Sequence, residues 1–102
     1  MSDTATWLTY EFNVHQPNVN WSDAAGIYIF TGINQVNKWV PLYIGQASSL
    51  VERLATHEQW PEAKKLGATH IHARVVSKQS DRDQIEKEMI QAYQPRLNTQ
   101  LK

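Results

Sequence analysis

The sequence contains no cysteine. A disulfide framework and a thiolate metal site are therefore both excluded. A small chain without disulfides fits the cytoplasm better than the outside of a cell, so we expect a cytoplasmic protein. The N-terminus lacks a basic and then apolar signal pattern, and no apolar run approaches the roughly 20 residues that a membrane span requires. We therefore expect no membrane partner.

An excess of either charge is also missing. Lysine and arginine together number 10, aspartate and glutamate also number 10, and the formal net charge is zero. Proteins that bind nucleic acids usually carry a basic excess, so any such binding here must come from a local patch or be weak. The contents of 41% hydrophobic and 20% charged residues fit a globular chain, and 102 residues suffice for one domain, 1–102.

Two short runs rich in β-branched and aromatic residues, 26–31 and 41–46, organise the chain. Turn-forming residues separate them, which predicts two antiparallel strands joined by a loop. Because alternate residues of a strand share a face, Tyr28 and Tyr43 can stand side by side, next to glycines such as Gly45. A purely structural hairpin would be expected to carry aliphatic residues at these positions.

Helix signals and further strand signals follow these runs. Ser49 and Glu52 have the form of a capping box, which predicts a helix with Arg53 and His57 one turn apart on a shared flank. Caps and periodicity also predict an N-terminal edge strand at 7–12, a short helix at 62–66, a third strand at 68–76 and a last helix from Ser80 to 93. The expected fold is therefore α/β (α+β): a small antiparallel sheet covered by helices, with an added N-terminal edge strand.

Gly26-Ile27-Tyr28 and Tyr43-Ile44-Gly45 together resemble the signature of the GIY-YIG nuclease family. Arg53 stands eight positions after the second glycine, His57 follows one turn later, and Glu86 precedes Asn98 by twelve positions, as in the family pattern. The resemblance covers residues 24–100 and leaves 1–23 as an N-terminal extension. It implies a three-stranded antiparallel sheet flanked by helices, similar to the catalytic domains of excinucleases and homing endonucleases.

This resemblance implies a metal-dependent endonuclease that hydrolyses DNA phosphodiester bonds. Such a reaction needs a divalent cation, an activated water and cationic support for developing charge. Glu86 is the candidate ligand for Mg²⁺ (or Mn²⁺), because one carboxylate with waters suits a cation that keeps most of its hydration shell. The structural alternative for Glu86 is a helix carboxylate paired with Arg82 or Lys87. Arg53 is the candidate for the scissile phosphate, and its alternative is a surface pair on the same helix.

Tyr28, Tyr43 and His57 are the candidates for positioning or deprotonating the attacking water. A phenol with a pKa near 10 is a poor base unless a metal or an arginine lowers it, whereas an imidazole with a pKa near 6.5 is an easier one. The sequence does not rank Tyr43 against His57. The structural alternatives are core packing for the tyrosines and a solvent-facing position for His57. Asn98 is expected to fix the site as a hydrogen-bond donor, or else to be a turn residue.

Gly45 and Gln46 are the candidate contacts to the substrate. Many family members carry a lysine directly after the second glycine, and this chain has Gln46. Glutamine can hydrogen-bond a phosphate but cannot neutralise it. Together with the zero net charge, this leaves an alternative function, a catalytically weak or inactive nucleic-acid-binding or protein-interaction module on the same fold.

DNA, branched or damaged, is the expected partner, which suggests a role in DNA repair. We expect no second domain that would choose the DNA, so specificity is expected to come from a protein partner, an oligomer or the shape of the substrate. Zinc is not expected, because no third ligand is evident for His70 and His72. Phosphate contacts outside the site are available at Lys38, Lys64, Lys65, Arg96 and Lys102.

Overall fold

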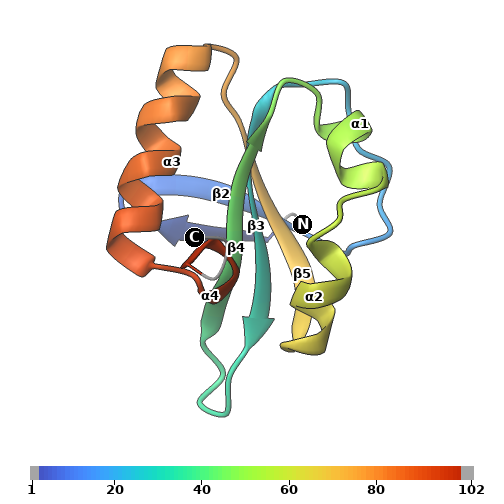
Figure 1. Ribbon diagram of the computed structural model, residues 1–102, viewed down its shortest axis with the longest axis vertical. Coiled ribbons are helices and arrows are strands. Elements are labelled where there is room, and N and C mark those ends of the chain that lie inside the picture. The colour runs from blue at the N-terminus through green and yellow to red at the C-terminus, as the bar shows by residue number, and fades with distance from the viewer. Residues whose placement is uncertain (1–2, 100–102) are drawn as a thin grey trace.

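A computed structural model describes residues 3–99, which contain one antiparallel sheet of five strands in the order β1-β2-β5-β3-β4. The strands are β1 (Thr4–Trp7), β2 (Tyr10–His15), β3 (Gly26–Ile33), β4 (Trp39–Ala47) and β5 (Ala68–Val75). The helices are α1 (Leu50–Ala55), α2 (Trp60–Lys65), α3 (Gln79–Tyr93) and α4 (Arg96–Thr99). Figure 1 shows α3 on one side of the sheet, α1 and α2 on the other, and α4 beside β4. None of these helices is long and apolar enough to cross a membrane.

The predicted number of strands is wrong, although β5, β3 and β4 form the expected three-stranded unit. The segment predicted as a single edge strand belongs to a hairpin of β1 and β2, and β2 pairs with β5. The turn between them lies at Leu8 and Thr9 and contains no Gly, Asn or Pro. Leu8 has a φ of 56°, and its N–H donates to the Tyr93 hydroxyl at 2.7 Å. A contact from α3 thus supports this turn, and local sequence does not reveal it.

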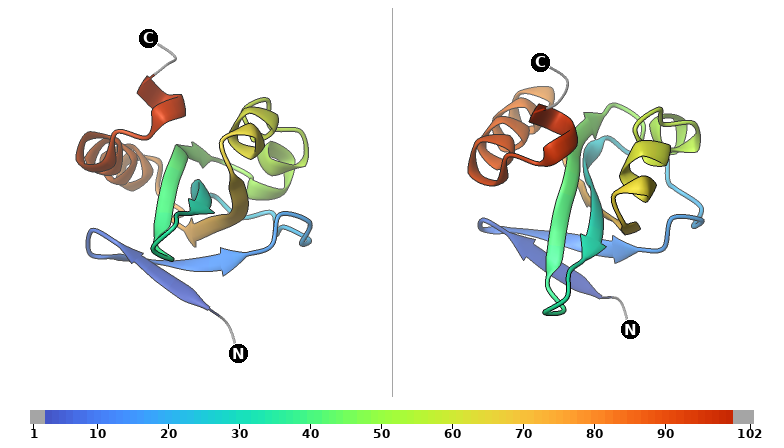
Figure 2. Two further views of the ribbon diagram at one scale, coloured as in Figure 1. Left: turned by 90° about the horizontal axis from the view of Figure 1, so that it is seen from below. Right: turned by 60° about the horizontal axis from the view of Figure 1, so that its bottom comes forward.

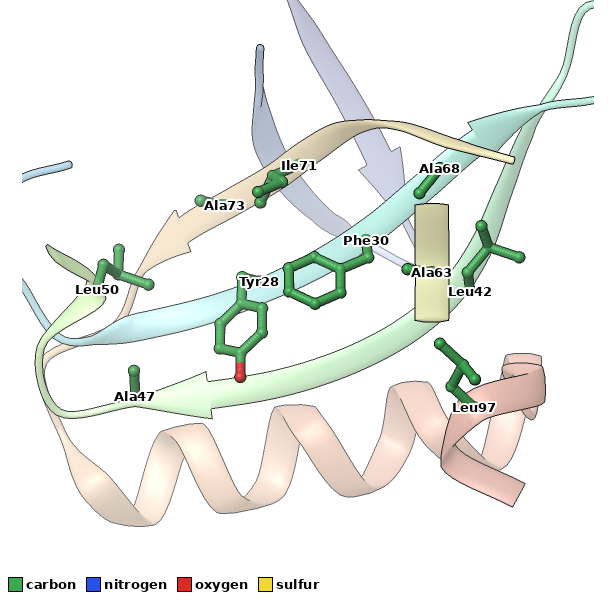
Figure 3. Close-up of a cluster of buried hydrophobic side chains, with 10 residues drawn as sticks. All are labelled: Tyr28, Phe30, Leu42, Ala47, Leu50, Ala63, Ala68, Ile71, Ala73 and Leu97. Carbon is green, nitrogen blue, oxygen red and sulfur yellow. The ribbon is translucent and has the colours of Figure 1, made fainter. Parts of the chain in front are cut away.

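β3 contributes side chains to the hydrophobic core on both faces of the sheet, because successive side chains of a strand point to opposite faces. Tyr28 and Phe30 pack on the face covered by α1, α2 and α4, as Figure 3 shows. Ile27 and Ile29 pack on the opposite face against α3 and the β1–β2 hairpin. The two views in Figure 2 show α3 on one side of β3 and β4, and α1 and α2 on the other. Tyr28, the first tyrosine of the sequence signature, is therefore a buried residue on the face that α1, α2 and α4 cover.

The helix boundaries differ from the predicted ones where the chain turns. Ser49 caps α1 as expected, because its hydroxyl accepts the backbone N–H of Glu52 at 3.4 Å. α1 ends at Ala55, so the prediction that His57 lies on the flank of this helix is wrong. α3 begins at Gln79, and Ser80 lies inside it rather than at its cap. The N-cap of α3 makes no side-chain hydrogen bond, so a capping signal was a poor guide to its start.

His72 of β5 is fully buried as a neutral ring. Its Nδ1 accepts the indole N–H of Trp7 at 2.9 Å, so the ring proton lies on Nε2. Nε2 has no hydrogen-bond partner among residues 3–99, and the ring of Trp39 stands nearly perpendicular at a centroid distance of 4.6 Å. Burial, followed by the charges of His70 and His15, lowers the pKa of His72 to about 4.

We expect the folded chain to lose stability as the pH falls from 7 to 5. Burial also lowers the pKa of His57 to about 4. A histidine of the unfolded chain titrates near 6.5, so below that pH the unfolded state takes up protons that the folded state does not. Linkage then gives a loss of about 2 kcal/mol for each of the two histidines over this range.

Urea denaturation at pH 7 and pH 5 measures this loss. The His72→Gln variant is expected to show a pH dependence smaller than that of the wild type by about 2 kcal/mol, because the contribution of this histidine is removed. Equal free energies of unfolding at the two pH values, or an unchanged dependence in the variant, would contradict the assignment.

Candidate active site

The side chain of Tyr28 crosses from β3 over Gly45 of β4. The two residues are paired in the sheet, and a Cβ on Gly45 would lie 2.5 Å from the Tyr28 Oη and 2.6 Å from its Cζ. In Figure 3 the hydroxyl of Tyr28 points toward β4. Only glycine permits this approach, since any side chain at position 45 would occupy the space of the phenol.

The Gly45→Ala variant is therefore expected to lower the free energy of unfolding by about 1–3 kcal/mol, the usual effect of overpacking. The phenol must move to admit the methyl group, so the hydrogen bond between the Tyr28 Oη and the Nε2 of His57 is lost as well. Urea denaturation followed by circular dichroism gives the stability, with Ser48→Ala at the exposed neighbouring loop position as the control. A Gly45→Ala variant as stable as the wild type would show that Tyr28 does not rest on Gly45.

His57 lies against Tyr28 in the protein interior. The residue is only 5% exposed, so the alternative of a solvent-facing histidine is wrong. Its Nδ1 accepts the backbone N–H of Gln59 at 3.0 Å, which places the proton of the neutral ring on Nε2. Nε2 lies 2.7 Å from the Tyr28 Oη and therefore donates to it. Burial, and then the charge of Arg53, lowers the pKa of His57 to about 4, so the ring is neutral at pH 7.

Tyr43 completes an aromatic cluster with Tyr28 and His57. Its ring centroid lies 5.2 Å from that of His57 and 6.3 Å from that of Tyr28. Burial raises the pKa of both phenols, Arg53 opposes that rise, and Glu86 adds to it. A guanidinium from α1 and a carboxylate from α3 therefore both lie within electrostatic reach of the two tyrosines.

Arg53 makes a two-point ion pair with Glu58. Its Nη1 and Nη2 donate to the two carboxylate oxygens, each at 2.8 Å. The hydrogen bond from Arg53 lowers the pKa of Glu58 to about 2. Glu58 was not found from the sequence, because a residue five positions on would not face Arg53 if the helix continued; α1 ends at Ala55 and the chain turns back. The side chains are 36% and 64% exposed, and Glu58 occupies the two terminal N–H groups that another planar anion would use.

Glu86 of α3 is half-buried and faces Gln46 of β4. Its Oε1 accepts the side-chain N–H of Gln46 at 2.9 Å, and its Oε2 has no hydrogen-bond partner within the described range. No ion pair joins Glu86 to Arg82 or Lys87 in residues 3–99, so the alternative role predicted for this carboxylate is not observed.

The donor set near Glu86 fits one kind of cation. The described residues contain no group of three or more His, Cys, Asp or Glu side chains that could hold a metal ion. A cation at Glu86 would rely on one carboxylate together with water and substrate oxygens. Mg²⁺ accepts such a ligand set, whereas structural zinc does not.

Asn98 of α4 holds the outer edge of β4. Its Oδ1 accepts the backbone N–H of Ile44, and its Nδ2 donates to the carbonyl of Ile44, both at 2.8 Å. The amide thus pairs with an edge strand as a neighbouring backbone would. Because Ile44 lies between Tyr43 and Gly45, this pairing fixes the strand at the site.

A shallow depression of about 400 Å³ opens between the end of β4 and α1, and both Gln46 and Arg53 line it. Figure 1 shows α1 and the first turns of α3 flanking this end of β4. The other predicted phosphate contacts lie elsewhere: Lys38 in the β3–β4 loop, Lys64 and Lys65 on α2, and Arg96 on α4. Lys102 lies outside the described residues. These basic residues do not surround the depression, so Arg53 is its principal cation.

Known proteins resemble this chain in fold and in sequence. The GIY-YIG N-terminal endonuclease domain of UvrC from Thermotoga maritima, in a structure bound to magnesium, matches with a TM-score of 0.60 and 26% sequence identity over 74% of this chain and 84% of that chain. A point mutant of the same domain, bound to its catalytic divalent cation, matches with a TM-score of 0.61 and 26% identity over 74% and 83% of the two chains. The UvrABC system protein C of Thermotoga sp. (strain RQ2) is 33% identical over 86 residues, which cover 79% of this chain. The chain belongs to the GIY-YIG family.

The GIY-YIG resemblance seen in the sequence is thus confirmed, with an α+β fold whose sheet has five strands rather than three. No family model matches the sequence. The aligned segment spans 14% of the length of the UvrABC system protein C. At one end of β4 this GIY-YIG domain brings together the side chains of Tyr28, Tyr43, Arg53, His57 and Glu86.

Proposed function

We propose that this GIY-YIG chain is a metal-dependent endonuclease that hydrolyses DNA phosphodiester bonds. The observation that carries this proposal is the grouping of Arg53, Glu86 and two phenols along the C-terminal half of β4, where Gln46 hydrogen-bonds Glu86 and lines one depression with Arg53. The similar UvrC domain is an endonuclease domain that binds a catalytic divalent cation, including magnesium. We further propose residues 24–100 as the catalytic unit, 1–23 as an extension, the cytoplasm as the compartment, and repair of branched or damaged DNA as the role.

Arg53 is proposed to bind the scissile phosphate. On binding DNA it releases Glu58 and donates its two terminal N–H groups to non-bridging phosphate oxygens, whose planar arrangement suits the guanidinium fork. The same groups support the negative charge that develops on phosphorus oxygens in the transition state. Mg²⁺ or Mn²⁺ held by Glu86 would supply Lewis-acid stabilisation of that charge.

Tyr43 is proposed to orient the attacking water through its hydroxyl. Both ring nitrogens of His57 are already hydrogen-bonded, to Gln59 and to Tyr28, so this buried ring is poorly placed to contact water. The Tyr43 hydroxyl has no hydrogen-bond partner in the part of the chain that the structure describes. Burial raises its pKa and Arg53 opposes that rise only in part, so the phenol is neutral at pH 7 and can hydrogen-bond the water. Because the Tyr28 hydroxyl oxygen accepts a hydrogen bond from the Nε2–H of His57, its own hydroxyl proton is free to point to the phosphate or to water.

Removal of divalent cations tests the proposed function. The purified chain is incubated with supercoiled, linear, nicked, flapped and branched DNA in Mg²⁺, in Mn²⁺ and in EDTA. We expect cleavage of at least one substrate with either metal, and loss of that cleavage to background in EDTA, because Glu86 alone does not stabilise the transition state.

The second candidate function is a binding module without turnover, favoured by the zero net charge and by Gln46 in the place of a lysine. A gel shift that weakens with salt, without cleavage in either metal, would support this candidate over the nuclease. The absence of both binding and cleavage would exclude both.

A further inference from the structure

The side-chain amide of Gln46 uses its entire hydrogen-bonding capacity. Its Nε2 donates to the Oε1 of Glu86 at 2.9 Å and to the Oδ1 of Asp83 at 2.8 Å. Its Oε1 accepts from the Nε of Arg82 at 3.2 Å and from the Nε2 of Gln79 at 3.0 Å. Ionised carboxylates only accept and a guanidinium only donates, so the orientation of the amide is determined by its partners.

Arg82 is a buried cation with neutral partners. The residue is only 4% exposed. Its Nη1 donates to the backbone carbonyls of Val76 and Ser77 at 3.0 and 2.9 Å, and its Nη2 donates to the Oε1 of Gln79 at 2.7 Å. No carboxylate of residues 3–99 lies within 4.0 Å of it as an ion pair. The positive charge of Arg82 therefore reaches Glu86 by way of the polarised amide of Gln46.

We propose that Gln46, held by Arg82, is the positioning residue that orients the Glu86 carboxylate for a divalent cation. This inference rests on the proposed function. Gln46 fixes Oε1 of Glu86 and leaves Oε2 without a partner in the described structure, and thus available to a metal ion. A ligating carboxylate is commonly held in this way by a hydrogen bond from a second residue.

This role differs from direct contact with the phosphate. Both N–H groups of the amide are taken by Glu86 and Asp83, so Gln46 could reach a phosphate only by giving up a carboxylate. A lysine at this position would bring a charge into the depression, but it could not accept a hydrogen bond from Arg82. Glutamine instead lies between the two charged groups: its Oε1 accepts from the Arg82 guanidinium, and its Nε2 donates to the Glu86 carboxylate.

Binding of Mn²⁺ without DNA tests the proposal, with free Mn²⁺ followed by electron paramagnetic resonance. Relative to wild type, Gln46→Leu is expected to raise the dissociation constant about 10-fold or more, the usual effect of losing such a partner. Gln84→Leu is the matched control. Gln84 lies on α3, as Glu86 does, and its Nε2 donates to the Oε2 of Glu88 at 2.9 Å, in a contact that does not involve the site. The control is expected to bind Mn²⁺ as the wild type does.

The Mg²⁺ dependence of DNA cleavage gives a second readout. In Gln46→Leu the Mg²⁺ concentration for half-maximal rate is expected to rise about 10-fold, while the rate at saturating Mg²⁺ stays within about 3-fold of wild type. A structural defect would instead lower the rate at all Mg²⁺ concentrations and lower the melting temperature.

Two outcomes separate this inference from the proposed function. If wild type binds Mn²⁺, Glu86→Gln does not, and Gln46→Leu matches wild type, the positioning role is overturned and the nuclease proposal stands. If neither wild type nor Glu86→Gln binds Mn²⁺, the metal site itself is overturned. Should Gln46→Leu not fold, the same titration on Arg82→Lys decides, because lysine retains the charge and loses the Nε donor; unchanged Mn²⁺ affinity there would also overturn the role.

Discussion

Glu86→Gln is expected to reduce DNA cleavage in Mg²⁺ by about 10³-fold or more, because it removes the proposed metal ligand and the charge stabilisation that depends on it. Glutamine has nearly the size of glutamate, and its carbonyl oxygen can still accept the hydrogen bond from Gln46. The fold should therefore persist. Single-turnover nicking of a supercoiled plasmid gives the rate, and circular dichroism checks the fold.

Glu62→Gln serves as the control for this variant. Glu62 is an exposed carboxylate on α2 whose only polar contact in the described residues is with Lys65 at 3.4 Å. We expect the control to cleave at the wild-type rate. Equal cleavage by Glu86→Gln and wild type would dismiss Glu86 from the site.

Arg53→Ala is expected to lower the cleavage rate by about 10³-fold, as for arginines that stabilise phosphoryl transition states. Arg53→Lys keeps the charge but loses the two-point fork, so we expect a loss of about 10²-fold. Both rates are measured at saturating DNA and Mg²⁺, which separates transition-state stabilisation from binding.

Glu58→Gln is the informative companion to the arginine variants. It also breaks the ion pair of Arg53, but it leaves the guanidinium in place and free for phosphate. We expect it to cleave at least as fast as wild type. If Glu58→Gln lost as much activity as Arg53→Ala, the ion pair itself, rather than the guanidinium, would be what the reaction requires.

Local sequence was sufficient for the elements whose signals are local. Alternation and β-branched residues predicted β3 and β4, and the serine cap predicted the start of α1. The β1–β2 hairpin was missed because its turn depends on the hydroxyl of Tyr93, on a helix 85 positions away. Helical spacing likewise placed His57 on α1, since nothing in the pattern marks the end of that helix at Ala55.

The candidate site shows the same contrast between features that local sequence reveals and features that depend on distant contacts. Residue types at family spacing identified the tyrosines, Arg53 and Glu86, which the fold brings to one end of β4. The partners of these groups could not be read from spacing. Gln46 meets Arg82 and Glu86 across 36 and 40 positions of chain, and Glu58 meets Arg53 only because the backbone turns back after α1.

The position of a bound Mn²⁺ ion tests the central claim most directly. Crystals of the wild-type chain, soaked in Mn²⁺ at a concentration that supports cleavage, are examined by anomalous diffraction. We predict an ion coordinated by the carboxylate of Glu86, next to the depression that Gln46 and Arg53 line. An ion bound elsewhere with none at Glu86, in a preparation that cuts DNA, would contradict a single site built from Glu86, Arg53 and the two tyrosines.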